Sequence, residues 1–243
     1  MNTLVLVPGL LCDHTLWAHQ TRYLSDIAEC LVPDITAADS INGFAHAVLT
    51  QAPLRFALAG LSMGGIIAHA IMAMAPERVE RLALIGTTAR ADVPEQTERR
   101  LRLIALVQAQ RFQEVAPLLL PALLHSSRGR ESELSDRVVQ MANAIGSAAF
   151  LRQINALMNR PDRRAQLASY RVPTLILCGR EDAITTLDMH TEMAAAIRDS
   201  ELAIIEECGH LSPMERPHAV TALMRQWLMR CAPLTAGVAQ KSA

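Results

Sequence analysis

Short apolar runs alternate with longer amphipathic stretches over the first third of the chain. The apolar runs are residues 3–7, 30–34, 56–59 and 82–86, and each predicts a buried strand. The stretches 13–24 and 42–52 predict helices, the second with Ser40 or Asn42 at its N-cap. Strands that are apolar on both faces and alternate with helices are typical of a parallel sheet covered by helices on each side.

The same pattern returns near the end of the chain. Residues 173–179 and 202–205 predict two more strands, and residues 187–197 predict a helix between them. Pro217 then opens a stretch whose apolar residues recur at helical spacing. We therefore expect an α/β fold with a sheet of about six strands.

The middle of the chain has a different pattern. From Asp92 to Tyr170 no run predicts a strand, and Leu134, Val138 and Met141 fall on one face of a helix. We expect an all-helical insertion of residues 92–170, interrupting a core formed by residues 1–91 and 171–243.

A glycine-flanked serine joins one strand to the helix that follows it. Ser62 stands in the sequence Gly-Leu-Ser-Met-Gly, between the apolar run 56–59 and the helical pattern 66–72. A turn this sharp brings side chains two residues either side of the serine into collision, which favours glycine at 60 and 64. The turn predicts an exposed hydroxyl above a helix N-terminus, where developing negative charge is stabilised.

Acidic residues and a histidine follow the later strands directly. Glu181 and Asp182 come after the strand 173–179, and His210 comes after the last strand. The carboxyl ends of parallel strands meet at one edge of the sheet, where the active sites of such folds lie. A serine needs a base to take its proton, and the base needs a carboxylate to orient it. Ser62, His210 and Asp182 supply these groups; Glu181 and Asp92 are the alternative acids.

Together these motifs resemble those of the α/β-hydrolase superfamily, over nearly the whole chain. They are Gly60-x-Ser62-x-Gly64, the turn from Gly179 to Asp182, and Gly209-His210 before the final helix. The resemblance implies a capped serine esterase with about six mostly parallel strands, flanked by helices, and residues 92–170 as an all-helical cap. It implies Ser62 as nucleophile, His210 as general base and then acid, and Asp182 as the orienting carboxylate.

The resemblance also implies an oxyanion hole made of backbone amides. One is the N–H of Met63, after the nucleophile, and the other comes from the loop after the first strand. Leu10 is the expected donor there, with Leu11 second. Many relatives carry His-Gly in this loop where the present chain has Pro8-Gly9, which concerns the geometry of the loop more than the chemistry.

The insertion is expected to select the substrate through an apolar underside. With Leu11, the candidate substrate-binding residues are Leu103, Leu106, Leu119, Met141 and Phe150. The insertion also carries a formal charge of about +3, from eleven arginines and eight acidic residues. This excess favours an anionic substrate only weakly, because arginines at helical spacing usually form a solvated face.

Composition excludes several other classes of protein. The net charge of −1 gives no electrostatic basis for binding nucleic acid or an anionic membrane. The five cysteines include no C-x-x-C pair, and the histidines lack paired ligand spacing, so neither a disulfide framework nor a metal site is expected. With no signal peptide or membrane-spanning run, we expect a cytoplasmic monomer or homodimer that needs no cofactor.

The sequence therefore predicts a serine hydrolase that cleaves small or medium carboxylic esters through an acyl-enzyme. One alternative keeps the same three residues but cleaves a carbon–carbon bond, an enamide or a lactone. A second alternative is a ligand-binding protein on the same fold that turns over little or no substrate.

Overall fold

The computed structural model describes residues 2–128 and 132–230, which form a six-stranded sheet in the order β2-β1-β3-β4-β5-β6. All neighbouring strands are parallel, which confirms the predicted sheet. The strands are β1 (Asn2–Val7), β2 (Ala28–Leu31), β3 (Phe56–Leu61), β4 (Val79–Ile85), β5 (Thr174–Gly179) and β6 (Ser200–Ile205).

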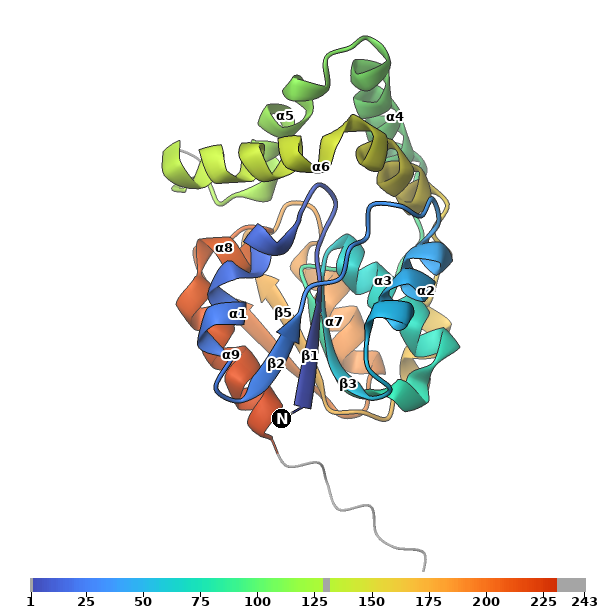
Figure 1. Ribbon diagram of the computed structural model, residues 1–243, viewed down its shortest axis with the longest axis vertical. Helices are drawn as coiled ribbons and strands as arrows, with labels where there is room; N and C mark the ends of the chain where they lie inside the picture. Colours follow the sequence, from blue (N-terminus) through green and yellow to red (C-terminus); the bar gives the residue numbers. More distant parts are fainter. Residues whose placement is uncertain (1, 129–131, 231–243) are drawn as a thin grey trace, which may run out of the picture.

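The two faces of the sheet bury alternate residues of each strand. Val5 and Val7 pack on one side with helices α2 (Ile41–Gln51), α3 (Met63–Met74) and α7 (Leu187–Ala196). Leu4 and Leu6 pack on the other, where α1 (Ala18–Tyr23), α8 (Ser212–Glu215) and α9 (Pro217–Met229) lie. Figure 1 shows these helices around the sheet. Since successive side chains of a strand point to opposite faces, an all-apolar strand serves both cores.

The second strand lies earlier than the sequence predicts. The expected strand over 30–34 is wrong in its bounds, because the paired residues are Ala28–Leu31. Pro33 has no N–H to donate to a ladder, and β2 is an edge strand, so pairing ends before it. Of the two candidate caps for α2, Ser40 is the one observed, with its Oγ accepting from the Gly43 N–H at 3.1 Å.

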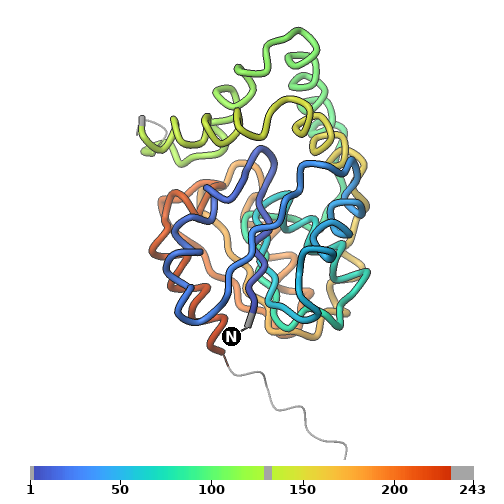
Figure 2. The backbone as a smooth tube through the Cα atoms, viewed as in Figure 1, coloured from blue at the N-terminus to red at the C-terminus, as the bar shows by residue number. Residues whose placement is uncertain are grey.

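A helical insertion separates β4 from β5, although these strands pair directly, with Leu82 opposite Thr174. We use this name for residues 94–158, whose described part contains α4 (Pro94–Gln108), α5 (Val115–Leu123) and α6 (Ser132–Met158). The insertion lies over the carboxyl ends of the strands (Figures 1 and 2). Within α6, Gly146 has φ 79°, and the helix bends there.

The chain leaves the core for the insertion and returns to it at one place. Arg160 Nη1 lies 2.5 Å from Asp92 Oδ1, and the Arg163 N–H donates to the Ala89 carbonyl at 2.7 Å. The outgoing and returning segments are thus bonded to each other. Among residues 2–128 and 132–230, no helix has the length and apolar character needed to cross a membrane.

Candidate active site

The sharp turn at the end of β3 holds Ser62 in a strained conformation. Its φ is 56° and its ψ is −116°, so the backbone lies outside the regions that L-residues prefer. A Cβ at position 60 would lie 2.3 Å from the Gly64 oxygen, and one at position 64 would lie 2.1 Å from the Val7 oxygen. Both positions therefore require glycine, as the sequence predicts.

His210 and Asp182 meet at the carboxyl ends of β5 and β6. His210 Nδ1 lies 2.8 Å from Asp182 Oδ2, and both residues are buried. Because a carboxylate only accepts, Nδ1 carries the hydrogen and Nε2 is left with a free lone pair. The loops after two adjacent strands thus assemble a histidine in the tautomer that a general base requires.

Further hydrogen bonds keep the Asp182 carboxylate ionised. Its Oδ1 accepts from the N–H groups of Ile184 and Thr185 at 2.9 Å each, and its Oδ2 accepts from the Thr185 hydroxyl at 2.8 Å. Burial raises the pKa of Asp182, but attraction to His210 and these hydrogen bonds outweigh it and lower the pKa to about 2.

The two alternative acids have other partners. Glu181 accepts from the Cys208 N–H at 3.0 Å. Asp92 pairs with Arg100 and Arg160. Of these three carboxylates, Asp182 is the one that contacts His210 within the described part of the chain.

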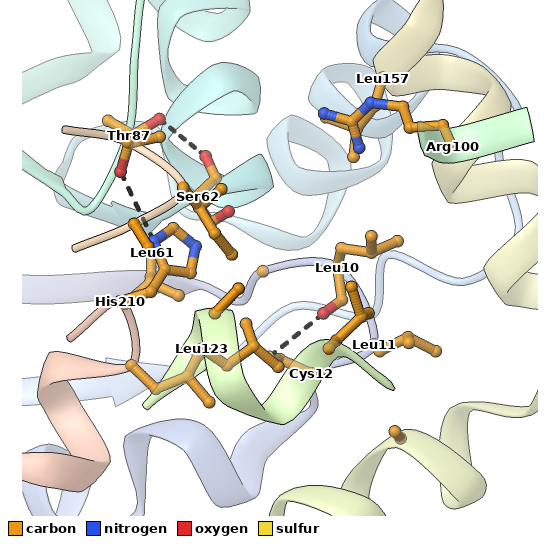
Figure 3. A pocket seen from close by; sticks show the side chains of 18 of the residues that line it. Leu10, Leu11, Cys12, Leu61, Ser62, Thr87, Arg100, Leu123, Leu157 and His210 are labelled. Carbon is orange, nitrogen blue, oxygen red and sulfur yellow. Dashed lines mark hydrogen bonds between the residues drawn. The ribbon is translucent and has the colours of Figure 1, made fainter. Parts of the chain in front are cut away.

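Ser62 and His210 line one cavity of about 230 Å³, between the sheet and the helical insertion. Figure 3 shows these two side chains close together, with Leu10, Leu11 and Cys12 farther to the right and below in the view. No hydrogen bond joins the Ser62 hydroxyl to His210 in residues 2–128 and 132–230. Such bonds often tighten only when substrate binds.

The loop after β1 offers one free amide to this cavity. The Leu11 N–H donates to Gln153 Oε1 at 3.2 Å. The Leu10 N–H has no such partner in the described residues. Met63 is the first residue of α3, so its N–H has no acceptor four residues earlier in the helix.

Comparison with known families agrees with this geometry. The family model described as serine aminopeptidase, S33, matches residues 25–217, which is more than half of the chain. The chain belongs to this family of α/β hydrolases.

Solved structures of other α/β hydrolases are similar over most of the chain. An esterase from Thermogutta terrifontis with malate bound is 30% identical, with a TM-score of 0.86, covering 94% of this chain and 89% of its own. An enol-lactonase from Burkholderia xenovorans LB400 is 24% identical, also with a TM-score of 0.86, covering 95% and 92%. In amino-acid sequence, a pimeloyl-[acyl-carrier protein] methyl ester esterase from Neisseria meningitidis is 24% identical, over 77% of this chain and 75% of its own.

The predicted substrate-binding residues of this α/β hydrolase divide into two groups. Leu11, Leu103, Leu119 and Met141 line the cavity. Leu106 and Phe150 do not, and the prediction was wrong for them. They pack in a small apolar core around Val115, which also includes Leu11 from the loop after β1.

Gln153 connects the helical insertion of this α/β hydrolase to the loop after β1. It is fully buried, and besides accepting from Leu11 it donates from Nε2 to the Ile35 carbonyl at 3.2 Å. Leu11 has φ 59°, a left-handed conformation that is uncommon for leucine. Gln153 therefore helps to hold a strained loop. The only signal in the sequence is a polar residue on the apolar face shared with Phe150 and Leu157.

A second connection holds the loop that carries His210. The Leu123 carbonyl, at the end of α5, accepts from the N–H groups of His210 and Leu211 at 3.0 and 3.1 Å. Glu215 Oε2 accepts from the His125 N–H at 2.8 Å, and burial raises the pKa of this carboxyl. The insertion thus contacts both loops that border Ser62.

The other histidine near the serine turn is part of the core. His69 Nδ1 lies 2.8 Å from the Tyr170 hydroxyl, and burial lowers the pKa of this histidine to about 3. In the described residues, no group of three or more His, Cys, Asp or Glu side chains is arranged to hold a metal ion.

Proposed function

We propose that this α/β hydrolase is a serine esterase that cleaves small or medium carboxylic esters. The observation that carries the proposal is the 2.8 Å contact between His210 Nδ1 and Asp182 Oδ2, made by a histidine that lines the same cavity as Ser62. This arrangement has the parts of a nucleophile, a base and an orienting carboxylate.

In the first half of the reaction, Ser62 Oγ attacks the ester carbonyl while His210 Nε2 takes the hydroxyl proton. The negative charge that develops on the carbonyl oxygen is stabilised by the N–H groups of Met63 and Leu10. Leu10 is favoured over Leu11 because the Leu11 N–H already donates to Gln153. The tetrahedral intermediate collapses as His210 gives its proton to the leaving alcohol, and an acyl-serine remains.

In the second half, His210 Nε2 takes a proton from water, and the resulting hydroxide attacks the acyl-serine. The same amides stabilise the second oxyanion, and the proton returns from His210 to Ser62 as the acid leaves. Asp182 stays ionised throughout and stabilises the imidazolium form of His210. The helical insertion acts as a cap over this site, and its leucines contact the acyl or alcohol portion of the substrate.

The relatives named above include enzymes of both ester and lactone cleavage, since the Burkholderia protein is named an enol-lactonase. The Thermogutta protein is named an esterase, and the Neisseria protein is named a methyl ester esterase. A set of p-nitrophenyl and methyl esters, compared with a lactone and an enamide, tests the choice of bond. Binding of an ester without any release of alcohol would favour the ligand-binding alternative.

Replacement of Ser62 tests the mechanism directly. We expect Ser62→Ala to fold normally but to lose ester turnover by a factor of about 10⁴ or more and to lose covalent labelling by a fluorophosphonate. Ser25→Ala is the matched control, because Ser25 is exposed on the surface and its hydroxyl donates to the Arg22 carbonyl. Turnover or labelling retained in Ser62→Ala would contradict the proposal.

A further inference from the structure

The charged side chains that line the cavity are all arginines. Arg99 and Arg100 come from α4, and Arg160 follows α6. Among the residues that the structure describes, the rest of the lining is mostly apolar and includes no acidic residue. The cavity therefore has a positively charged part that the proposed ester chemistry does not use.

Asp92 offsets only part of this charge. Its carboxylate lies 3.0 Å from Arg100 Nε and 2.5 Å from Arg160 Nη1. The side chains of Asp92 and Arg160 are 1% and 3% exposed, and that of Arg100 is 19% exposed. One carboxylate thus faces two largely buried guanidinium groups, which leaves a net charge of +1. Arg99 adds a further positive charge.

The two guanidinium groups differ in how many of their donors are occupied. Arg160 donates to the carbonyls of Arg90 and Leu157 and to Gln96 Oε1, in addition to its pair with Asp92. Arg100 uses Nε and Nη2 on Asp92, and its Nη1 has no partner in the described residues. The Arg99 guanidinium likewise has no hydrogen bond or ion pair there. Free donors on arginines at a cavity wall match an acceptor from the ligand.

Arg100 and Ser62 lie apart across the cavity. Figure 3 shows the Arg100 guanidinium on the opposite side of the cavity from Ser62 and His210. Leu103, Leu119 and Met141 also line this space. A volume of about 230 Å³ is below the range of about 300–1,000 Å³ that suits drug-sized ligands, so a small molecule is expected.

We propose that the free donors of Arg99 and Arg100 bind a carboxylate of the substrate, while Arg160 adds positive charge to this part of the cavity, so that the enzyme cleaves esters that also carry a free acid group. The inference rests on the proposed esterase function and names its substrate class. A short apolar chain between the two groups contacts the leucines, while the ester carbonyl lies at Ser62. Guanidinium groups favour this ligand because their planar donors match both carboxylate oxygens. The positive end of the cavity also attracts anions from solution.

Two esters of the same shape test the proposal. Monomethyl glutarate carries a carboxylate, and methyl 4-carbamoylbutanoate replaces that carboxylate with a neutral amide. We expect the wild-type enzyme to have a kcat/KM at least about tenfold higher for the anionic ester. The preference shrinks as salt is added, because ions screen the attraction.

Arginine variants show whether that preference comes from this part of the cavity. In Arg100→Gln the ratio of the two kcat/KM values falls by roughly tenfold, chiefly through KM for the anionic ester. In Arg99→Gln the ratio falls by a smaller factor, about threefold, since this side chain is exposed. Arg102→Gln is the matched control, because Arg102 lies on the same helix, pairs with Glu98 and does not line the cavity.

Direct binding separates this proposal from the esterase function. Glutarate is titrated into the Ser62→Ala protein in a calorimeter, and we expect binding that Arg100→Gln weakens by roughly tenfold. If the neutral ester is cleaved as well as the anionic one, or if both arginine variants keep the wild-type ratio, the anion site is wrong while the esterase stands. If glutarate binds but no ester is cleaved, the esterase function is wrong and the anion site stands.

Discussion

Asp182 combines burial with an unusually complete set of donors. The N–H groups of Ile184 and Thr185, the Thr185 hydroxyl and His210 all point at one carboxylate. In the unfolded chain these donors are absent, and the pKa of the carboxyl returns to its ordinary value of 3.8. The difference in pKa between the folded and unfolded states makes this residue a source of acid-dependent stability.

The pKa of Asp182 is lower in the folded state, at about 2, than in the unfolded state, so ionisation of this carboxyl stabilises the fold. The stabilisation is complete above about pH 4 to 5 and is lost as the pH falls toward 2, with a total of about 2 kcal/mol. We expect Asp182→Asn to lack this part of the acid-dependent change in the free energy of unfolding, measured by urea denaturation at pH 5 and pH 2.5. We also expect kcat for ester hydrolysis to fall by about 10³–10⁴-fold.

Glu181→Gln is the matched control, since its carboxylate bonds the Cys208 N–H and no histidine. A larger loss of kcat in Glu181→Gln than in Asp182→Asn would contradict the assignment of the acid. An equal change in stability with pH in the wild type and in Asp182→Asn would contradict the linkage.

The positions of Ser62, Asp182 and His210 can be predicted because each follows an apolar strand, and strand order brings those loops together. The pairing of Asp92 with Arg160 cannot be predicted in this way. These residues are far apart in the sequence, and their contact depends on where the chain returns to the core. Charge counting reveals an excess of arginine in the insertion but not which arginines face a cavity.

At the scale of elements, the loop after β1 and the helical insertion are joined through Gln153. Its Oε1 accepts the Leu11 N–H and its Nε2 donates to Ile35, all in a buried environment. A buried N–H that loses its acceptor destabilises the local conformation by about 1–3 kcal/mol. Leu11 has a strained φ, so the loop after β1 lowers its energy by changing conformation once that bond is lost.

We therefore expect Gln153→Leu to lower kcat by about tenfold or more while KM changes less, because the adjacent Leu10 N–H no longer faces the oxyanion at the correct distance. Steady-state kinetics on a neutral ester measure both constants. Asn155→Ala provides the control, because Asn155 is exposed on the same helix. A change confined to KM in Gln153→Leu would contradict a positioning role.

Elements with one chemical character are the ones that the sequence predicts well. The central strands are mostly apolar, and their burial is complete in β3 and β5. The burial of residues in the helices of the insertion is harder to predict, because some of these residues line the cavity and others pack in a separate apolar core. For Leu106 and Phe150, helical periodicity identifies a buried side but not which of the two it faces.

At the scale of the whole molecule, the ion pairs of Asp92 are one of the attachments between the insertion and the core. Removing the carboxylate leaves two largely buried guanidinium groups without their counter-charge. We expect Asp92→Asn to lower the free energy of unfolding by about 3–5 kcal/mol, measured by urea denaturation at neutral pH.

Glu98→Gln is the comparison, because it removes an exposed ion pair with Arg102 and should cost less than about 1 kcal/mol. The double variant of Asp92→Asn with Arg160→Gln should be less destabilised than the sum of the single variants, since the two groups interact. Strict additivity would contradict the coupling that the 2.5 Å contact implies.

The bonds from Asp92 to Arg160 and from Arg163 to Ala89 join the segment that enters the insertion to the segment that leaves it. For the sheet, the insertion is therefore one long loop whose two ends are held together. The entropic cost of closing a loop grows only with the logarithm of its length, by about 0.6 kcal/mol for each doubling. A longer or shorter helical module grafted between these two segments therefore costs the sheet little. The loops that carry Leu11 and His210 keep their positions only if such a module replaces the Gln153 side chain and the Leu123 carbonyl, which accept hydrogen bonds from them.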